Sequence, residues 1–466
     1  MTSIYTLNLT ALLALNGALF YSRQSQSQPQ AQAQPSSTPS QKDLTTPLEP
    51  KYVPSRIQSL LTSPLTPFLT VYTLVMASDW LQGPYLYSLY ADEHSLPPSL
   101  IPSLFTTGFL SGALSGSFIG SLADTYGRKT ACLSFCVVYA LSCLFTTLSS
   151  SIPVLFIGRV LGGVGTSLLF TVFESFLVSD FKNRGLEGRL GETFGTMSTL
   201  NSLVAIASGV GSEGLVSVCG TRRAPFWVAA GVLGLAGGVI SYTWKENYAQ
   251  PLTTTKDNKK DDNLKASTSL LKTLLNPTIL ALGLSTTIFE GSMYLFVFFW
   301  APALQSSSRA GTSLPYGVIF AAFMASTLAS SLLFARITSK LSFSSLLLAL
   351  LGVSSGCFFL VASLSSRNGS SQLTFWIFCL FEACVGVYFP TMGYLKGKLI
   401  EDGVRSQVYG FLRIPLNVFV VVALLVTGRM ESEKAFVGVF RVCSVLLLVA
   451  AGGFWGVVRR GGSVDV

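Results

Sequence analysis

Apolar stretches long enough to cross a membrane recur along the whole chain, with short polar breaks between them. A helix needs roughly 20 apolar residues to cross a bilayer, whose hydrocarbon core is about 30 Å thick. Half of the residues are hydrophobic and only 11% are charged, compared with about a quarter in ordinary soluble domains. We therefore expect an all-α membrane protein. The expected core spans are 64–90, 99–123, 129–149, 152–178, 195–218, 225–244, 273–303, 315–338, 343–364, 372–395, 405–428 and 435–458.

The spans fall into two groups of six, which we expect to form two helix bundles. An additional apolar stretch at 4–21 has no basic region before it, which favours a signal anchor over a cleaved signal peptide. Gln/Ser/Pro-rich sequence follows and is too polar to fold alone. The expected division is a signal-anchor-like helix at 1–21, a disordered linker at 22–58, a first half at 59–244, a cytoplasmic linker at 245–272, a second half at 273–458 and a cytoplasmic tail at 459–466.

The net charge of +9 is explained by where the basic residues lie. If the segment 122–129 is cytoplasmic, most of the 31 Lys and Arg fall on the inner side, as the positive-inside rule requires. Nucleic-acid binding would need a folded basic face with aromatic residues, and the sequence offers none. We therefore expect the lipid bilayer as the partner, most simply the plasma membrane, with an endomembrane as the alternative.

The eight Cys and the single His give little support for a metal or another cofactor. Nearly all Cys lie inside spans and none forms a CxxC pair, so we expect them to pack as small apolar residues. His94 lies in an outer loop beside Asp92 and Glu93, an arrangement that does not predict zinc. No nucleophile and base pair or phosphate-binding loop stands out, so we do not expect an enzyme.

The segment GSLADTYGRK (120–129) lies between the second and third spans. Its carboxylate and cations can cap helix ends and latch the two halves on the inner side, and a glycine permits the tight turn. The segment resembles the loop signature of the major facilitator superfamily, with Thr125 where the family has a basic residue. The residues concerned are Gly120, Asp124, Gly127, Arg128 and Lys129.

Seven charged residues inside the spans draw attention, because a charge at the helix centre costs roughly 2.5–3.5 kcal/mol. Such residues either form salt bridges or face a water-filled path, and both alternatives stay open at this point. For Glu174 and Arg441 we favour the salt bridge. The seven are Asp79, Arg159, Glu174, Glu290, Glu382, Arg413 and Arg441.

Several segments between about 60 and 430 look like the eukaryotic molybdate-anion transporter family of the major facilitator superfamily. They include SDWLQGPYLYSLY (78–90), FEGSMYLFVFFWAP (289–302), GVYFPTMGYLKGK (386–398) and FLRIPLN (411–417). The resemblance implies a secondary transporter, with a central cavity between the two six-helix bundles, that takes up molybdate, a tetrahedral dianion. We expect it to be active as a monomer. Alternatives are a carrier of sulfate, of an organic anion or of a sugar, and, from another class, a transporter-like sensor.

Certain residues suit an oxyanion on physical grounds. Arg159 and Arg413 offer forked donors. Gly83 and Pro84 are expected to interrupt the first span and free backbone groups there. Neutral hydrogen bonds can come from Gln82, Tyr85, Tyr87, Asn201 and Asn417, of which Asn201 and Asn417 align in a weak internal repeat.

A dianion that enters a cell with a negative interior faces roughly 4.6 kcal/mol per 100 mV, so concentrative uptake needs a co-transported cation. Asp79, Glu290 and Glu382 lie in spans expected to line the path and are candidates to carry a proton, Glu290 first and Glu382 second. Asn368 begins an Asn-Gly-Ser glycosylation acceptor in a loop expected on the outer side.

Overall fold

The computed structural model is helical throughout the part of the chain that it describes, and no strand occurs there. The predicted all-α fold is confirmed. The described residues are 2–27, 65–185, 190–248, 274–308, 313–365, 371–400, 405–428 and 432–461.

Each predicted span coincides with a helix, and most boundaries agree within a few residues. The N-terminal helix α1 (Thr2–Ser27) is longer than the apolar stretch that predicts it. The first half contains α3 (Thr66–Gln82), η2 (Gly83–Tyr85), α4 (Leu86–Ser88), η3 (Leu89–Glu93), α5 (Leu100–Tyr126), α6 (Arg128–Leu148), α7 (Ile152–Asn183), α8 (Leu190–Cys219) and α9 (Ala224–Thr243). The second contains α11 (Pro277–Ser306), α12 (Tyr316–Thr338), α13 (Phe343–Ser365), α14 (Ser371–Leu399), α15 (Arg405–Thr427) and α16 (Ser432–Gly461).

Ten of the described helices are long and apolar enough to cross a membrane: α1, α6 to α9, α11 to α14, and α16. The helix α3 has 17 residues and is shorter than each of these ten helices. Many Ser, Thr and Gly residues interrupt the apolar sequence of α5. The apolar part of α15 is a shorter segment, Ile414–Thr427.

The first span is interrupted where the sequence has Gly83 and Pro84. The α-helix stops at Gln82, a short 3₁₀ turn follows, and the chain reaches Glu93 through one further turn and a π-helix. Proline lacks a backbone N–H and crowds the preceding turn, so an interior proline breaks the regular hydrogen-bond ladder. Backbone groups are thereby released from the α-helical pattern near the outer end of this span.

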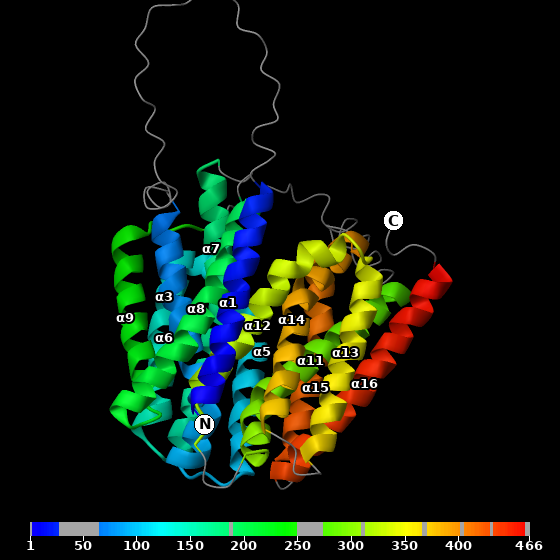
Figure 1. Ribbon diagram of the computed structural model, residues 1–466. Helices are drawn as coiled ribbons and strands as arrows, with labels where there is room; N and C mark the ends of the chain where they lie inside the picture. The colour runs from blue at the N-terminus through cyan, green and yellow to red at the C-terminus, as the bar shows by residue number, and fades with distance from the viewer. Residues whose placement is uncertain are drawn as a thin grey trace, which may run out of the picture.

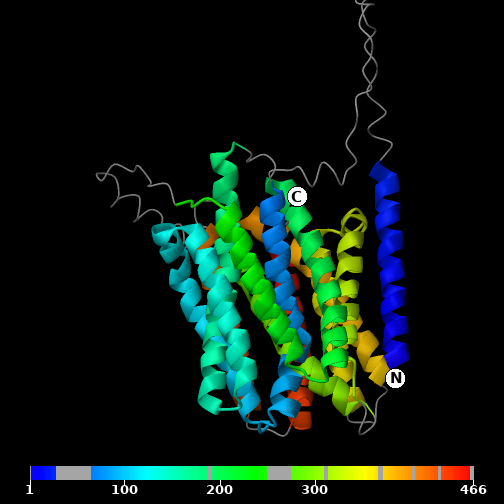
Figure 2. The same cartoon turned by 90° about the vertical axis from the view of Figure 1, so that its left-hand side faces the viewer.

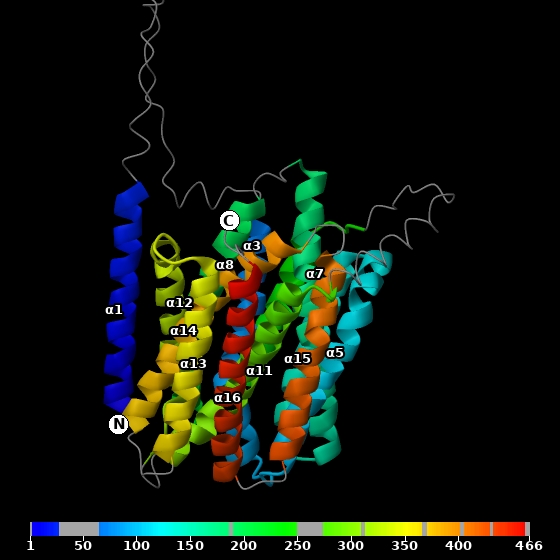
Figure 3. The same ribbon diagram turned by 90° about the vertical axis from the view of Figure 1, so that its right-hand side faces the viewer.

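The two groups of helices stand side by side with their axes roughly aligned. Figure 1 shows α3, α6, α8 and α9 on the left and α11, α13, α15 and α16 on the right. The halves meet where α8 packs on α12 and where α5 packs on α15. The helix α1 lies against α12, at the edge of the bundle, as the views in Figure 2 and Figure 3 also show.

The turn between α5 and α6 is shorter than the sequence suggests. The helix α5 continues to Tyr126, and α6 already begins at Arg128. Gly127 alone makes the turn, at a φ of 104° that L-residues with a side chain rarely adopt. Most of the segment 120–129 is therefore helical.

Candidate functional site

Arg159 is a half-buried cation inside α7. Its Nε lies 3.4 Å from the carbonyl oxygen of Leu104, and its guanidinium carbon lies 5.1 Å from the centre of the Phe105 ring. A Cβ atom at Gly108 would come within 2.6 Å of its Nη2, so a side chain at this position would displace the guanidinium. Within the described residues, no carboxylate lies at ion-pair distance from this guanidinium.

A buried tyrosine accompanies this arginine. Tyr90 and Arg159 both contact the Phe105 ring, and the ring centres of Tyr90 and Phe105 are 6.3 Å apart. The Tyr90 hydroxyl is buried and has no hydrogen-bond partner within the part of the chain described. A buried donor without a partner is costly in a protein interior, so this region can accept a ligand oxygen.

Asp79, the acidic candidate of the first half, accepts a short hydrogen bond from the Tyr139 hydroxyl of α6. A structural salt bridge to Arg159 was the alternative for this residue. In this conformation the two side chains form no ion pair, so the Asp79 carboxylate is held by a neutral donor.

Glu290 of α11 has a cationic partner. Its Oε1 lies 3.7 Å from Lys396 Nζ and accepts a hydrogen bond of 3.2 Å from the Tyr388 hydroxyl. Both partners belong to α14. The charge on Glu290 is therefore partly balanced inside the second half.

Glu382 of α14 is only 5% exposed, and its environment differs. The hydroxyl of Thr327 on α12 donates to its Oε2 over 3.0 Å. No Lys or Arg among the described residues lies at ion-pair distance from it. This carboxyl group is buried in the second half with a neutral donor alone.

Several predicted neutral donors are already engaged within the protein. The Asn201 side-chain oxygen accepts from Trp80 Nε1 over 2.8 Å, and Gln82 Nε2 donates to the Ser78 carbonyl over 3.2 Å. The Tyr87 ring packs edge-on against Phe298, with ring centres 5.6 Å apart. The Tyr87 contact joins the two halves, whereas the bonds of Asn201 and Gln82 lie within the first half. All three side chains would have to exchange partners to reach a substrate.

Three further predicted site residues belong to the second half. Asn417 is half-buried on α15. The backbone of Arg413 belongs to the same helix, but its side chain lies outside the described part of the structure. Asn368, the glycosylation candidate, also lies outside it. The described part of the structure therefore does not place the Arg413 side chain relative to Arg159.

Glu213 of α8 links the halves near the outer end. Its Oε2 accepts from the Tyr85 hydroxyl over 2.7 Å and from the backbone N–H of Gly317 over 2.9 Å. Gly317 is the second residue of α12, where the helix N-terminus favours a carboxylate. The predicted substrate donor Tyr85 is thus bound to Glu213 in this conformation.

The backbones of α8 and α12 also approach closely beside Glu213. A Cβ at Gly209 would lie 2.8 Å from the Gly317 carbonyl oxygen, and a Cβ at Gly317 would lie 2.8 Å from Glu213 Cβ. Small residues permit such close helix contacts in membranes. The two glycines therefore let the halves close at this end.

Aromatic side chains extend this closure. Phe105 of α5 contacts Phe298 of α11, with ring centres 4.7 Å apart. Phe109 and Tyr294, from the same two helices, are 5.4 Å apart. Edge-to-face contacts of this kind stabilise the interface between the halves.

At the opposite end, the signature segment makes contacts within the first half. Arg128 binds Asp124 at 2.7 Å. Glu246 accepts from the backbone N–H of Lys129 over 2.7 Å, at the start of α6. Lys129 Nζ donates to the Trp244 carbonyl over 2.7 Å, at the end of α9. Gly120 faces α7, where a Cβ would lie 3.7 Å from Thr171.

These contacts cap two helix ends, and none of them reaches the second half. A latch between the halves at this end would require another conformation.

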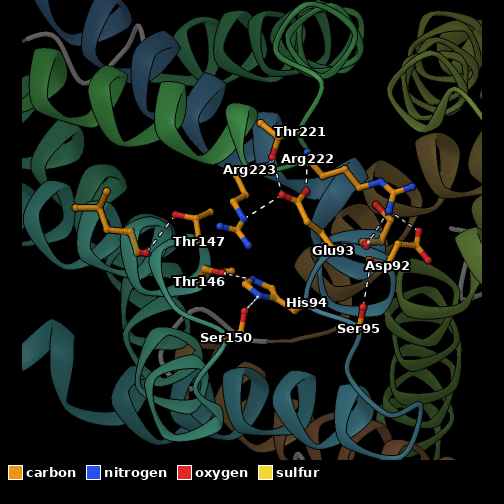
Figure 4. A network of polar contacts seen from close by, with 12 residues as sticks. Asp92, Glu93, His94, Ser95, Thr146, Thr147, Ser150, Thr221, Arg222 and Arg223 are labelled. Carbon is orange, nitrogen blue, oxygen red and sulfur yellow. Dashed lines mark hydrogen bonds and ion pairs between the residues drawn. The ribbon is translucent and has the colours of Figure 1, made fainter.

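Two ion pairs hold the outer rim of the first half together, as Figure 4 shows. Arg222 binds Asp92 at 2.6 Å, and Arg223 binds Glu93 at 3.0 Å. Glu93 also accepts from the Thr221 hydroxyl over 2.6 Å. These partners satisfy both carboxylates, so the rim joins the end of the first span to the turn before α9.

His94 is buried beside this rim (Figure 4). Its Nδ1 lies 2.9 Å from the Ser150 hydroxyl and its Nε2 lies 2.9 Å from the Thr146 carbonyl. No group of three or more His, Cys, Asp or Glu residues able to hold a metal occurs in the described ranges. The two polar contacts of its ring give His94 a structural role at this rim.

Sequence reasoning missed two charged residues of this region. Glu213 lies inside the predicted span 195–218, so counting every charge in every span would have found it. Lys396, the partner of Glu290, lies one residue beyond the predicted span 372–395. Charges near span ends therefore belong in such a count.

Comparisons with known proteins identify the family. A family model described as sugar transporters with twelve transmembrane segments matches residues 60–380. A molybdate-anion transporter of Xenopus tropicalis is 31% identical over 390 residues, which cover 82% of this chain and 83% of the relative. One of Takifugu rubripes is 31% identical over 417 residues, which cover 82% and 85%. The chain belongs to the molybdate-anion transporter family. It is therefore a transporter and a multi-pass membrane protein, not an enzyme.

Solved structures of other transporters share the fold of this chain. A peptide transporter of the POT family in complex with sulfate has a TM-score of 0.68 at 14% identity, and the match covers 86% of this chain and 95% of that one. The inward-open xylose transporter XylE from E. coli has a TM-score of 0.63 at 12% identity, with 86% and 98% covered. At such identities these structures establish the fold alone.

Proposed function

We propose that this transporter takes up molybdate, or another tetrahedral oxyanion, by alternating access. The observation that carries the proposal is the Arg159 guanidinium, half-buried among membrane helices without a carboxylate at ion-pair distance. A buried cation is costly unless an opposite charge joins it. An oxyanion supplies that charge, and the planar fork of arginine suits its oxygens.

The contacts between the halves support alternating access. Those that involve Glu213, Phe298 and Tyr294 lie toward the outer end, whereas the signature segment at the inner end contacts only its own half. This pattern is that of a carrier closed to the outside. Access from outside then requires that Glu213 release Tyr85 and the start of α12.

Proton coupling is the finer part of the proposal. Glu290 was the first choice from the sequence, but Lys396 offsets its charge. Glu382 is more buried and has Thr327 as its only side-chain partner in the described region. Because a lone carboxylate is costly in a membrane interior while its acid form is much less so, we assign the coupling proton to Glu382.

We place this carrier in the plasma membrane, as a monomer, with both ends of its twelve-helix core on the cytoplasmic side. The excess of Lys and Arg on that side supports the orientation. In this orientation, Glu213 and the outer rim face the exterior.

Tracer uptake tests the substrate. Cells that lack their own molybdate carrier would express this chain and receive labelled molybdate, with unlabelled molybdate, sulfate or a hexose as competitors. We expect saturable uptake that unlabelled molybdate abolishes. Equal competition by sulfate would widen the substrate to tetrahedral dianions as a class.

A sugar is the second candidate, because the matching family model is described as sugar transporters. Uptake of labelled hexose without uptake of labelled molybdate would overturn the oxyanion proposal. A vector control and an Arg159→Leu variant complete the experiment, and that variant should lose uptake of the oxyanion.

A further inference from the structure

The N-terminal helix α1 buries one continuous stripe. Tyr5, Leu9, Leu12 and Asn16 are each 9% exposed or less, and they recur at intervals of three or four residues, as one face of a helix does. The remaining faces are largely apolar and face outward. The exposed large residues are Ile4, Leu7, Leu13, Leu15, Phe20 and Tyr21.

Polar contacts anchor this stripe to the second half. Asn16 Nδ2 donates to the Ala325 carbonyl of α12 over 2.9 Å, in a fully buried setting. Asn8 Nδ2 donates to the Gln372 side-chain oxygen of α14 over 2.9 Å. Apolar surface alone drives no helix association in lipid, so buried hydrogen bonds and close packing determine where a membrane helix docks.

The contacts extend along the whole membrane thickness. At one end the Tyr5 ring packs edge-on against Phe375 of α14, with ring centres 5.3 Å apart. At the other end Arg336 of α12 donates to the Ser22 hydroxyl over 2.9 Å. At 1.5 Å per residue, Tyr5 and Ser22 are separated by about 25 Å, close to the hydrocarbon thickness. The helix therefore spans the bilayer parallel to α12, with its N-terminus at the outer end.

We propose that α1 is a retained thirteenth membrane helix that belongs to the second half and moves with it as one body. All four anchoring partners lie on α12 and α14, and those two helices also pack against each other. The movement of the halves rests on the alternating access proposed above. A cleaved leader or a helix that moves independently would not keep these contacts.

A cross-linking experiment tests the proposal. Asn8→Cys with Gln372→Cys joins α1 to α14, and Phe109→Cys with Tyr294→Cys joins the two halves. A short bifunctional thiol reagent would be applied to membranes, and cross-linking would be scored as the loss of two maleimide–polyethylene glycol additions from the denatured protein. Each variant that carries only one of these four substitutions must transport molybdate before treatment. This control separates folding defects from effects of the cross-link.

We expect the first pair to cross-link and to keep at least about half of the molybdate uptake that it shows before treatment. The second pair should also cross-link, but it should lose more than about nine tenths of its uptake. A first pair that cross-links and loses uptake like the second would show that α1 must separate from α14, which overturns the proposal. Failure of the first pair to cross-link, while the second does, would also overturn it. If neither link stops uptake, alternating access itself fails.

Retention is tested on the same protein. A tag placed before Thr2 should remain on the full-length protein at the cell surface, together with a tag at the C-terminus. Surface protein that carries only the C-terminal tag would show that α1 is removed, and the proposal would be wrong.

Discussion

Arg159 is held by a carbonyl oxygen and an aromatic face, and neither neutralises its charge. We predict that Arg159→Leu lowers molybdate uptake about 10- to 100-fold with little change in surface expression, because hydrogen bonds to a charged group contribute roughly 1.5–3 kcal/mol. Arg159→Lys should recover only a small part, since a point charge lacks the fork.

The matched control is Arg184→Leu, which removes an exposed arginine just past the inner end of the same helix, where it binds Asp180. That variant should transport normally. Loss of surface protein in Arg159→Leu would instead indicate a structural role. Arg413→Leu tests the second predicted arginine by the same assay.

Glu382 and Glu290 differ in their surroundings, and the difference predicts distinct phenotypes. Glu382→Gln should still exchange labelled for unlabelled molybdate but should lose acceleration by an inward proton gradient, because an amide keeps the contact with Thr327 and cannot carry a proton. Glu290→Gln removes the negative charge that lies 3.7 Å from Lys396 Nζ and should impair exchange as well. Uptake by the unmodified protein that ignores external pH and protonophores would contradict proton coupling.

At the scale of elements, the crossing of α8 and α12 has almost no spare room. A methyl group at Gly317 would clash with the backbone of Gly209 and with Glu213 Cβ, whereas one at Gly234 on α9 would meet nothing within 4 Å. Overpacking costs about 1–3 kcal/mol. Gly317→Ala should therefore hinder outer closure and lower uptake about 5- to 100-fold, while Gly234→Ala should not.

Accessibility measurements can identify the cause. In Gly317→Ala, a cysteine introduced near the outer contact should react faster with an impermeant thiol reagent than in the parent protein. An unchanged reaction rate together with reduced uptake would place the defect elsewhere.

The helices themselves were predictable, because long apolar runs leave a membrane chain little alternative to α-helix. The interruption at Gly83 and Pro84 was also visible, since the chemistry of proline is local. The helical state of Asp124 and its neighbours was not anticipated, because a polar cluster next to a glycine looks like a loop in sequence. Only the structure shows that Gly127 alone makes the turn.

The site was less predictable than the fold. The charged positions Asp79, Arg159 and Glu382 could be picked out because charges are rare in membrane spans. Their partners could not, since Tyr139 and Thr327 come from helices about 60 residues away in sequence. Which donors remain available to a ligand depends on how the helices pack, and local patterns do not contain that information.

At the scale of the whole molecule, the orientation can be tested directly. An epitope inserted in 245–272 should bind antibody only after permeabilisation, and one inserted next to residue 368 should bind in intact cells. The excess of basic residues on one side carries this expectation. The opposite labelling pattern would invert the orientation and with it the assignment of Glu213 to the outer closure.

The docking of α1 has a consequence for the synthesis of the protein. Asn16 and its acceptor, the carbonyl of Ala325, are 309 residues apart in sequence. At a synthesis rate of about 5–20 residues per second, roughly 15 to 60 s pass between the appearance of the two groups. During that interval α1 is already an apolar helix whose Asn16 amide has the Leu12 carbonyl of its own helix as an acceptor but not yet the carbonyl of Ala325. The insertion machinery of the cell therefore has to hold or shelter this helix until α12 emerges, and ribosome pausing within the second half should lengthen its exposure to quality control.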